Sequence, residues 1–169
     1  IVSHKLQLPY TNNYATPKTL GVDRIALITA AVQQYPNSNT LIIDAGTCVT
    51  YDFLNDENAY LGGAISPGLT IRYEALHNLT AKLPLLKIKD ATFLIGNSTE
   101  NSIHSGVING LVNEIDGTIQ QYQQQYTDLT VILTGGDTNF LAKRLKSSIF
   151  ANSNFLLEGL NHLLKINID

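Results

Sequence analysis

An apolar run that ends on an aspartate is the feature that most constrains how this chain folds. Residues 41–43 are apolar, Asp44 follows them, and the pair Gly46-Thr47 separates Asp44 from a second strand-like run. The pattern predicts two neighbouring strands joined by a tight turn, with a carboxylate and hydroxyl groups at one end of a sheet. Such groups suit the binding of a cation or a phosphate. A glycine turn that binds nothing is an equally good interpretation of this segment alone.

The composition describes a globular chain of 169 residues, enough for one domain and a fragment of a second. With 44% hydrophobic and 15% charged residues, the chain can form a core and is not disordered. The net charge of -3 excludes a chain-wide basic field for nucleic acid or an anionic membrane. No apolar run approaches the roughly 20 residues that span a bilayer. The single Cys48 predicts a small core side chain and a reducing compartment.

Hydrophobic periodicity predicts a helix, a group of three strands, and then helices that alternate with strands. This order is typical of an α/β layered domain. Asp52, in the second strand, is expected to be a solvated or structural residue. The expected helices cover residues 23–35, a segment from Pro67-Gly68 to Pro84, residues 98–126 and a C-terminal stretch around residues 156–164; the expected strands lie near 40–44, 47–54, 59–65 and 131–134, with a weaker strand or turn near 91–95.

Three further segments contain residue types that could form a ligand site. Gly21-Val22-Asp23-Arg24 stands at a helix start, where Asp23 could act as a general base and Arg24 could hold an anionic substrate. A helix cap and a structural salt bridge explain the same two residues. The glycines of segment 62–68 allow close approach of a ligand or of a packed neighbour. Segment 134–137 offers backbone N–H groups before a helix capped by Asp137, a turn that many α/β proteins have without a ligand.

Together, in this order and at these spacings, the segments resemble the type III pantothenate kinase family. The resemblance extends over nearly all of the chain, and the motifs are specific as a set. The matching features are Tyr14 seven residues before Gly21 with Pro17 between them, the Gly-x-Asp-Arg motif, the Asp-x-Gly-Thr strand end at Asp44, Gly-Gly-Ala-Ile-Ser-Pro-Gly from Gly62, Leu83-Pro84, Ile95-Gly96-Asn97-Ser98-Thr99 with Ser105-Gly106, Thr134-Gly135-Gly136-Asp137 and Glu158-Gly159-Leu160.

The resemblance implies a role for each residue that matches a family motif. It implies that Asp23 is the catalytic base toward the primary hydroxyl of pantothenate. It also implies that Asp44 holds a monovalent cation, potassium or ammonium, and that Thr47 contacts ATP. The positions that it implies for pantothenate binding are Tyr14, Gly21, Val22, Asp23, Arg24 and Thr99.

The implied reaction is the ATP-dependent phosphorylation of pantothenate to 4′-phosphopantothenate, the first step of coenzyme A synthesis, with Mg²⁺ on the ATP phosphates. The family implies a cytoplasmic homodimer with the substrate site near the dimer interface, and no nucleic-acid or membrane partner. The implied fold is a ribonuclease-H-like lobe, the unit that is doubled in the actin, Hsp70 and sugar-kinase superfamily. We expect residues 37–169 to form the second lobe. Residues 1–36 would be the end of the first lobe, with the pantothenate-binding segment and a helix.

The family's opening Asp-x-Gly-Asn-Thr motif does not occur in this sequence, and the sequence contains no Met. We therefore expect a C-terminal portion that is inactive alone and has an apolar surface where a first lobe would pack. Two other interpretations stay open: a non-catalytic transcriptional regulator resembling Bvg accessory factor, and another small-molecule kinase of the superfamily. The presence of Asp23, Asp44 and Thr47 favours catalysis over the regulator. Tyr14 with the Gly-x-Asp-Arg motif favours pantothenate over another substrate.

Overall fold

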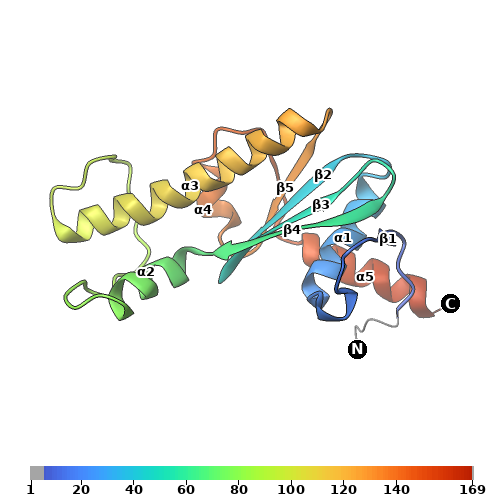
Figure 1. Ribbon diagram of the computed structural model, residues 1–169, viewed down its shortest axis with the longest axis horizontal. Coiled ribbons are helices and arrows are strands. Elements are labelled where there is room, and N and C mark those ends of the chain that lie inside the picture. The colour runs from blue at the N-terminus through green and yellow to red at the C-terminus, as the bar shows by residue number, and fades with distance from the viewer. Residues whose placement is uncertain (1–5, 169) are drawn as a thin grey trace.

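A mixed β-sheet organises residues 6–168, the part of the chain that the computed structural model describes. Its six strands lie in the order β1-β4-β3-β2-β5-β6 (Figure 1). The central strand β2 is antiparallel to β3 and parallel to β5. The three strands expected first in the chain are therefore neighbours in space. The strands are β1 (Thr11–Asn12), β2 (Thr40–Ala45), β3 (Cys48–Leu54), β4 (Ala59–Pro67), β5 (Thr130–Thr134) and β6 (Phe150–Ala151).

Helices cover both faces of the sheet, which confirms the predicted α/β class (Figure 1). On one face, α1 (Val22–Gln34) packs against α5 (Phe155–Ile168). The long helix α3 (Thr99–Gln125) covers the other face and packs against α2 (Leu69–Asn78). The short α4 (Thr138–Ala142) follows β5. Within residues 6–168, no helix combines the length and apolar character needed to cross a membrane.

The alternation of side chains along the central strands builds a separate core on each face. Leu41 and Ile43 belong to the core beneath α3. Ile42 and Ile132 belong to the core beneath α1 and α5. Asp44 has the same parity as Ile42, so its side chain lies on the α1 face, beyond the last apolar side chain of β2 on that face. The fold therefore places a carboxylate beside the apolar layer that supports α1.

The contact between α1 and α5 depends on a glycine. Phe155, Gly159 and Leu163 are spaced by four and form the buried face of α5. A Cβ at Gly159 would overlap the carbonyl oxygen of Ala26 on α1, so the two helices approach as closely as their backbones allow. In the structure, α1 thus packs on the same sheet as the C-terminal helix. The division into residues 1–36 and 37–169 stays a prediction, and residues 1–5 of the first segment lie outside the described part.

The helix after Pro67 is shorter than predicted. It ends at Asn78 instead of Pro84, and residues 79–98 contain neither helix nor strand. Of the strand or turn expected near 91–95, the strand is absent and residues 94–95 form a bend. The Thr80 hydroxyl donates to the Leu76 carbonyl at 2.6 Å, and His77 Nδ1 lies 2.7 Å from the Leu83 carbonyl. These side chains engage carbonyl groups at the point where the helix stops.

Cys48 is exposed and does not belong to the core, contrary to our prediction. It is the first residue of β3 and pairs with Pro67 at the very end of the sheet. The next residue, Val49, takes the buried position under α3. The strand was predicted correctly, but its first residue lies at the exposed end of the sheet.

Candidate active site

The carboxyl end of β2 places Asp44 between hydroxyl groups from both neighbouring strands. Asp44 pairs in register with Thr50 of β3 and with Thr134 of β5. Directly paired residues project to the same face of a sheet, so all three side chains lie on the α1 face. Asp44 is half-buried and Thr134 is buried. This end of the sheet therefore presents a partly shielded carboxylate flanked by two hydroxyls.

Asp23 stands in the first turn of α1 and is exposed to solvent. Its Oδ1 accepts a hydrogen bond from the backbone N–H of Arg24 at 2.8 Å. Gly21 leaves room for this arrangement, because a Cβ there would overlap Asp23 Oδ1. The helix dipole favours a negative charge at this position. Asp23 is thus a fixed carboxylate that remains open to a ligand.

The negative charges of the site act together on Asp44. Burial raises the pKa of Asp44 above its ordinary value, and the charges of Asp23 and then Asp52 raise it further. Asp23 and Asp52 are therefore each within electrostatic reach of Asp44, and a cation beside Asp44 would relieve the repulsion. Among residues 6–168, no group of three or more His, Cys, Asp or Glu side chains could hold a metal ion. Backbone, hydroxyl or substrate oxygens would have to complete the coordination of a cation there.

The turn after β5 closes over the end of β2. Gly135 adopts a φ of +94°, in the left-handed region that favours glycine. A Cβ at this position would overlap both Asp44 Oδ1 and the Ala45 carbonyl oxygen. The backbone N–H of Asp137 donates to the same Ala45 carbonyl at 3.0 Å. Asp137 occupies the N-cap position of α4, as predicted, but its side chain makes no capping hydrogen bond. Thr47 is exposed in the turn between β2 and β3, at this same end of the sheet.

Arg24 lies behind the site and not on its surface, with only 6% of the residue exposed. Its Nε donates to Asp52 Oδ1 at 2.9 Å, and its Nη2 donates to the Tyr60 hydroxyl at 2.8 Å. The Tyr14 ring stacks on the Tyr60 ring, and its centroid lies 5.6 Å from the Arg24 Cζ atom. The structural salt bridge that we considered for Arg24 is therefore present, and Tyr14 is brought to it.

Our sequence reasoning did not assign Asp52 and Tyr60 to the site. Asp52 has the same parity on β3 as Thr50 and is fully buried on the α1 face, which excludes the solvated alternative. The signal that could have found it is a charged residue at an inward position of an alternating strand. Tyr60 gave no comparable signal, because an inward tyrosine in a strand is most often a core residue.

Thr99 lies apart from the other predicted site residues. It is the first residue of α3, and this end of the helix is at the left of Figure 1, whereas α1 is at the right. There Thr99 lines an apolar groove of about 930 Å³ between α2 and α3. Leu79, which also lines the groove, is 83% exposed. Within one chain, the structure brings together Tyr14, Asp23 and Asp44 but does not add Thr99 to them.

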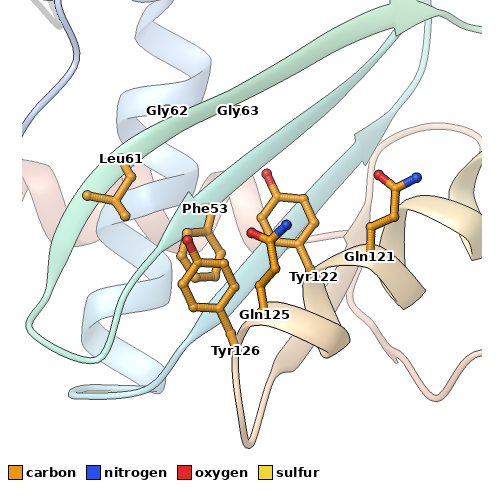
Figure 2. A pocket seen from close by; sticks show the side chains of 8 residues that line it. All are labelled: Phe53, Leu61, Gly62, Gly63, Gln121, Tyr122, Gln125 and Tyr126. Carbon is orange, nitrogen blue, oxygen red and sulfur yellow. The ribbon is translucent and has the colours of Figure 1, made fainter.

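A second cavity, of about 360 Å³, lies under the C-terminal end of α3 (Figure 2). Its aromatic wall consists of Phe53, Tyr122 and Tyr126, with the Phe53 ring centroid 4.2 Å from that of Tyr126. The glycine pair 62–63 of β4 borders it. Phe53 faces α3, so this cavity is on the opposite side of the sheet from Asp44. Because none of the described residues that line it is a carboxylate, a histidine or a lysine, we assign it no part in the chemistry.

The architecture is that of a ribonuclease-H-like lobe, with three antiparallel strands followed by two parallel ones and helices on both faces. A solved structure described as a conserved putative Baf family transcriptional activator from Campylobacter jejuni has this fold. The match covers 92% of this chain and 67% of the Campylobacter jejuni chain, with a TM-score of 0.65. At 22% identity, the likeness shows the fold alone.

Sequence comparison gives the family. The type III pantothenate kinase family model matches residues 1–121. A type III pantothenate kinase of Flavobacterium johnsoniae is 57% identical over 167 residues, which are 99% of this chain and 68% of that protein. That of Christiangramia forsetii is 61% identical over 95% of this chain and 66% of its own length. The chain therefore belongs to the type III pantothenate kinase family. It spans about two thirds of the length of these curated relatives.

Proposed function

We propose that the protein to which this chain belongs phosphorylates pantothenate with ATP, giving 4′-phosphopantothenate for coenzyme A synthesis. Relatives described as type III pantothenate kinases, 57–61% identical, support this activity. The observation in the structure that carries the proposal is the placement of Asp23. An exposed carboxylate is fixed at the start of α1, within electrostatic reach of a second carboxylate at the end of β2. A substrate hydroxyl and the phosphates of a nucleotide can meet between these two groups.

In this proposal, Asp23 is the general base. Phosphoryl transfer depends mainly on positioning and on neutralising charge, so the base has to orient the hydroxyl and accept its proton as the new bond forms. The hydrogen bond from the Arg24 N–H to Oδ1 holds the Asp23 carboxylate in one orientation. The exposure of Asp23 leaves the carboxylate accessible to the primary hydroxyl of pantothenate.

Asp44 would hold a monovalent cation, potassium or ammonium, and Thr47 would contact ATP. The fit of a cation follows from the charges, because the pKa of Asp44 is raised by burial and then by two neighbouring carboxylates. The oxygens of Thr50 and Thr134 on the adjoining strands are available beside it. A Mg²⁺ ion would neutralise charge on the transferred phosphates. The reducing compartment that fits the single Cys48 is the cytoplasm.

Pantothenate would bind against Tyr14 and the Gly21–Arg24 segment, with Thr99 supplied by a second copy of the chain. Thr99 lies at the far end of α3 from α1, so it cannot reach Asp23 within one chain. It does line the apolar groove between α2 and α3, the kind of surface that a homodimer buries. A dimer through this groove would bury Thr99 at the subunit interface, the arrangement in which a second copy could supply it to the site.

The test is ADP release by the full-length protein with ATP, Mg²⁺, potassium and pantothenate. We expect Asp23→Asn to lower kcat by at least about a hundredfold, the usual range for loss of a general base. Asp56→Asn, in the exposed loop between β3 and β4, is the matched control and should leave kcat unchanged. Turnover that persists in Asp23→Asn would remove the base from the mechanism.

The same assay separates the alternative functions. The Campylobacter jejuni protein of similar fold is described as a putative transcriptional activator, which represents the regulator alternative. For such a regulator, the folded full-length protein would release no ADP when pantothenate is added. A kinase for another small molecule would be active with a sugar or acetate in place of pantothenate. The presence of Asp23 and Asp44 in one site favours a kinase, and Tyr14 beside Arg24 favours pantothenate.

A further inference from the structure

A closed set of hydrogen bonds lies directly behind the proposed pantothenate site. Arg24 Nε donates to Asp52 Oδ1 and Oδ2 at 2.9 and 3.2 Å, and Nη2 lies 2.7 Å from Oδ1. The same Nη2 donates to the Tyr60 hydroxyl at 2.8 Å, and that hydroxyl donates to Asp52 Oδ1 at 2.7 Å. Each of the three side chains therefore contacts the other two. This triangle of Arg24, Asp52 and Tyr60 joins α1 to strands β3 and β4.

The triangle is shielded from water, which makes its geometry rigid. Asp52 is 0% exposed and Tyr60 is 0% exposed. A buried carboxylate requires hydrogen-bond donors on its oxygens, and Thr50 adds a further one at 3.4 Å. Burial and the neighbouring carboxylate raise the pKa of Tyr60, so its hydroxyl keeps its proton and remains a donor. A planar guanidinium that forms this fork with a carboxylate has little freedom to move.

Two groups of the proposed site depend on the position of Arg24. The backbone N–H of Arg24 donates to Asp23 Oδ1, so fixing Arg24 also fixes the proposed base. The ring of Tyr14 lies against the guanidinium and stacks on Tyr60, with centroids 5.8 Å apart. Gly62 of β4 borders the Tyr14 ring, because a Cβ on that glycine would lie in ordinary van der Waals contact with Tyr14 Cδ2, at 3.5 Å. The triangle thus contacts the Tyr14 ring through Arg24 and Tyr60, and it holds Asp23 through the backbone N–H of Arg24.

We infer that Asp52 and Tyr60 are positioning residues for pantothenate, which hold Arg24 so that Asp23 and Tyr14 face the substrate. In this arrangement Arg24 acts mainly through geometry, because Asp52 already pairs its charge. The charge of Arg24 is therefore already neutralised by Asp52, so the carboxylate of pantothenate would meet an ion pair and not a free cation. The expected change in kcat/KM rests on the proposed function. The claim that the triangle fixes the start of α1 can be measured by hydrogen exchange without any activity.

The first experiment compares Tyr60→Phe with wild type in the full-length protein. The change removes one hydroxyl from the triangle and keeps the ring that stacks on Tyr14. We expect kcat/KM for pantothenate to fall about tenfold to a hundredfold, as for a displaced catalytic group, while KM for ATP stays the same. Amide hydrogen exchange across residues 21–26 should become faster in the variant. Tyr73→Phe is the matched control, because the Tyr73 hydroxyl is also buried and lies 2.7 Å from His104 Nδ1 on the other side of the sheet.

A second pair of variants tests the carboxylate. Asp52→Asn removes the charge that pairs with Arg24, and Asp116→Asn removes another buried carboxylate, which accepts hydrogen bonds from the backbone N–H groups of Lys146 and Ser147. Both should lower the melting temperature. Only Asp52→Asn should change kcat/KM for pantothenate and hydrogen exchange in residues 21–26. If Asp52→Asn does not fold, Arg24→Lys replaces it, because lysine keeps the charge but loses the fork.

The outcomes separate the inference from the proposed function. Wild-type protein without pantothenate-dependent turnover would overturn the proposed function, and the exchange measurements would still decide whether the triangle holds the start of α1. Active wild type, with Tyr60→Phe indistinguishable from Tyr73→Phe in both kcat/KM for pantothenate and hydrogen exchange, would overturn the inference. Arg24→Lys that binds pantothenate as well as wild type would likewise show that Arg24 acts as a charge.

Discussion

At the scale of single residues, Asp44 combines a functional position with an energetic cost. A carboxyl group whose pKa is raised in the folded state destabilises the protein as the pH rises through that pKa. The reason is that the folded state holds the proton more tightly than the unfolded chain does. Asp44 fits this case, since burial and two neighbouring carboxylates all raise its pKa. At neutral pH, its charge therefore works against folding. A residue that is kept at such a cost is expected to bind something positive.

Asp44→Asn should consequently stabilise the protein in the absence of cations. At pH 8 we expect the melting temperature of the variant to be higher than that of the wild type, because the variant has no charge to bury at this position. The difference should shrink as the pH falls and vanish below about 4, where Asp44 is protonated in the unfolded chain too. Adding potassium should raise the melting temperature of the wild type and leave the variant unaffected. A variant that is less stable than wild type at pH 8 would contradict this account.

At the scale of elements, the packing of α1 against α5 fixes the position of the helix that carries Asp23. Gly159→Ala should destabilise the protein by about 1–3 kcal/mol, because the added methyl overlaps the Ala26 carbonyl and forces the helices apart. Urea unfolding followed by circular dichroism measures the change. Gly117→Ala in α3 is the control: a Cβ there meets no atom within 4 Å, so it should stabilise by up to about 1 kcal/mol. Equal effects of the two substitutions would show that the α1–α5 contact is not tight.

The same elements show how far sequence reasoning reaches. Local periodicity placed α1, α3 and β2 to within one or two residues, because their burial patterns repeat along the chain. The predicted end of α2 was wrong because the helix stops at Asn78, where the Thr80 hydroxyl donates to the Leu76 carbonyl of the last turn and His77 contacts the Leu83 carbonyl beyond the helix. For the site, the motifs located Asp23 and Asp44, each at the end of an element. The triangle behind them joins residues 28 and 36 positions apart, and no local pattern encodes such pairings.

At the scale of the whole molecule, the placement of Thr99 makes a dimer part of the proposed mechanism. The start of α3, which contains Thr99, and the start of α1, which contains Asp23, lie at opposite ends of the folded molecule. The proposed substrate site is therefore complete only when two chains associate. The groove between α2 and α3 is the surface on which this depends, with Leu79 strongly exposed at its edge. The stability of the single chain is therefore separate from the completeness of the site. A substitution in the groove can leave the chain folded and still prevent the site from being completed.

Leu79→Asp tests this separation. A charge in the groove should convert the proposed full-length dimer to a folded monomer, because burying an unpaired carboxylate at an interface is unfavourable. The monomer should stay folded, since the side chain is 83% exposed in the single chain, and its melting temperature should fall only by what the dimer contact contributed. Pantothenate turnover should fall with the dimer fraction, as measured by light scattering and ADP release on the same samples. Leu61→Asp, at a residue 44% exposed near the other end of the sheet, should keep both the dimer and the turnover. Full activity in a Leu79→Asp monomer would show that Thr99 of a second copy is not needed.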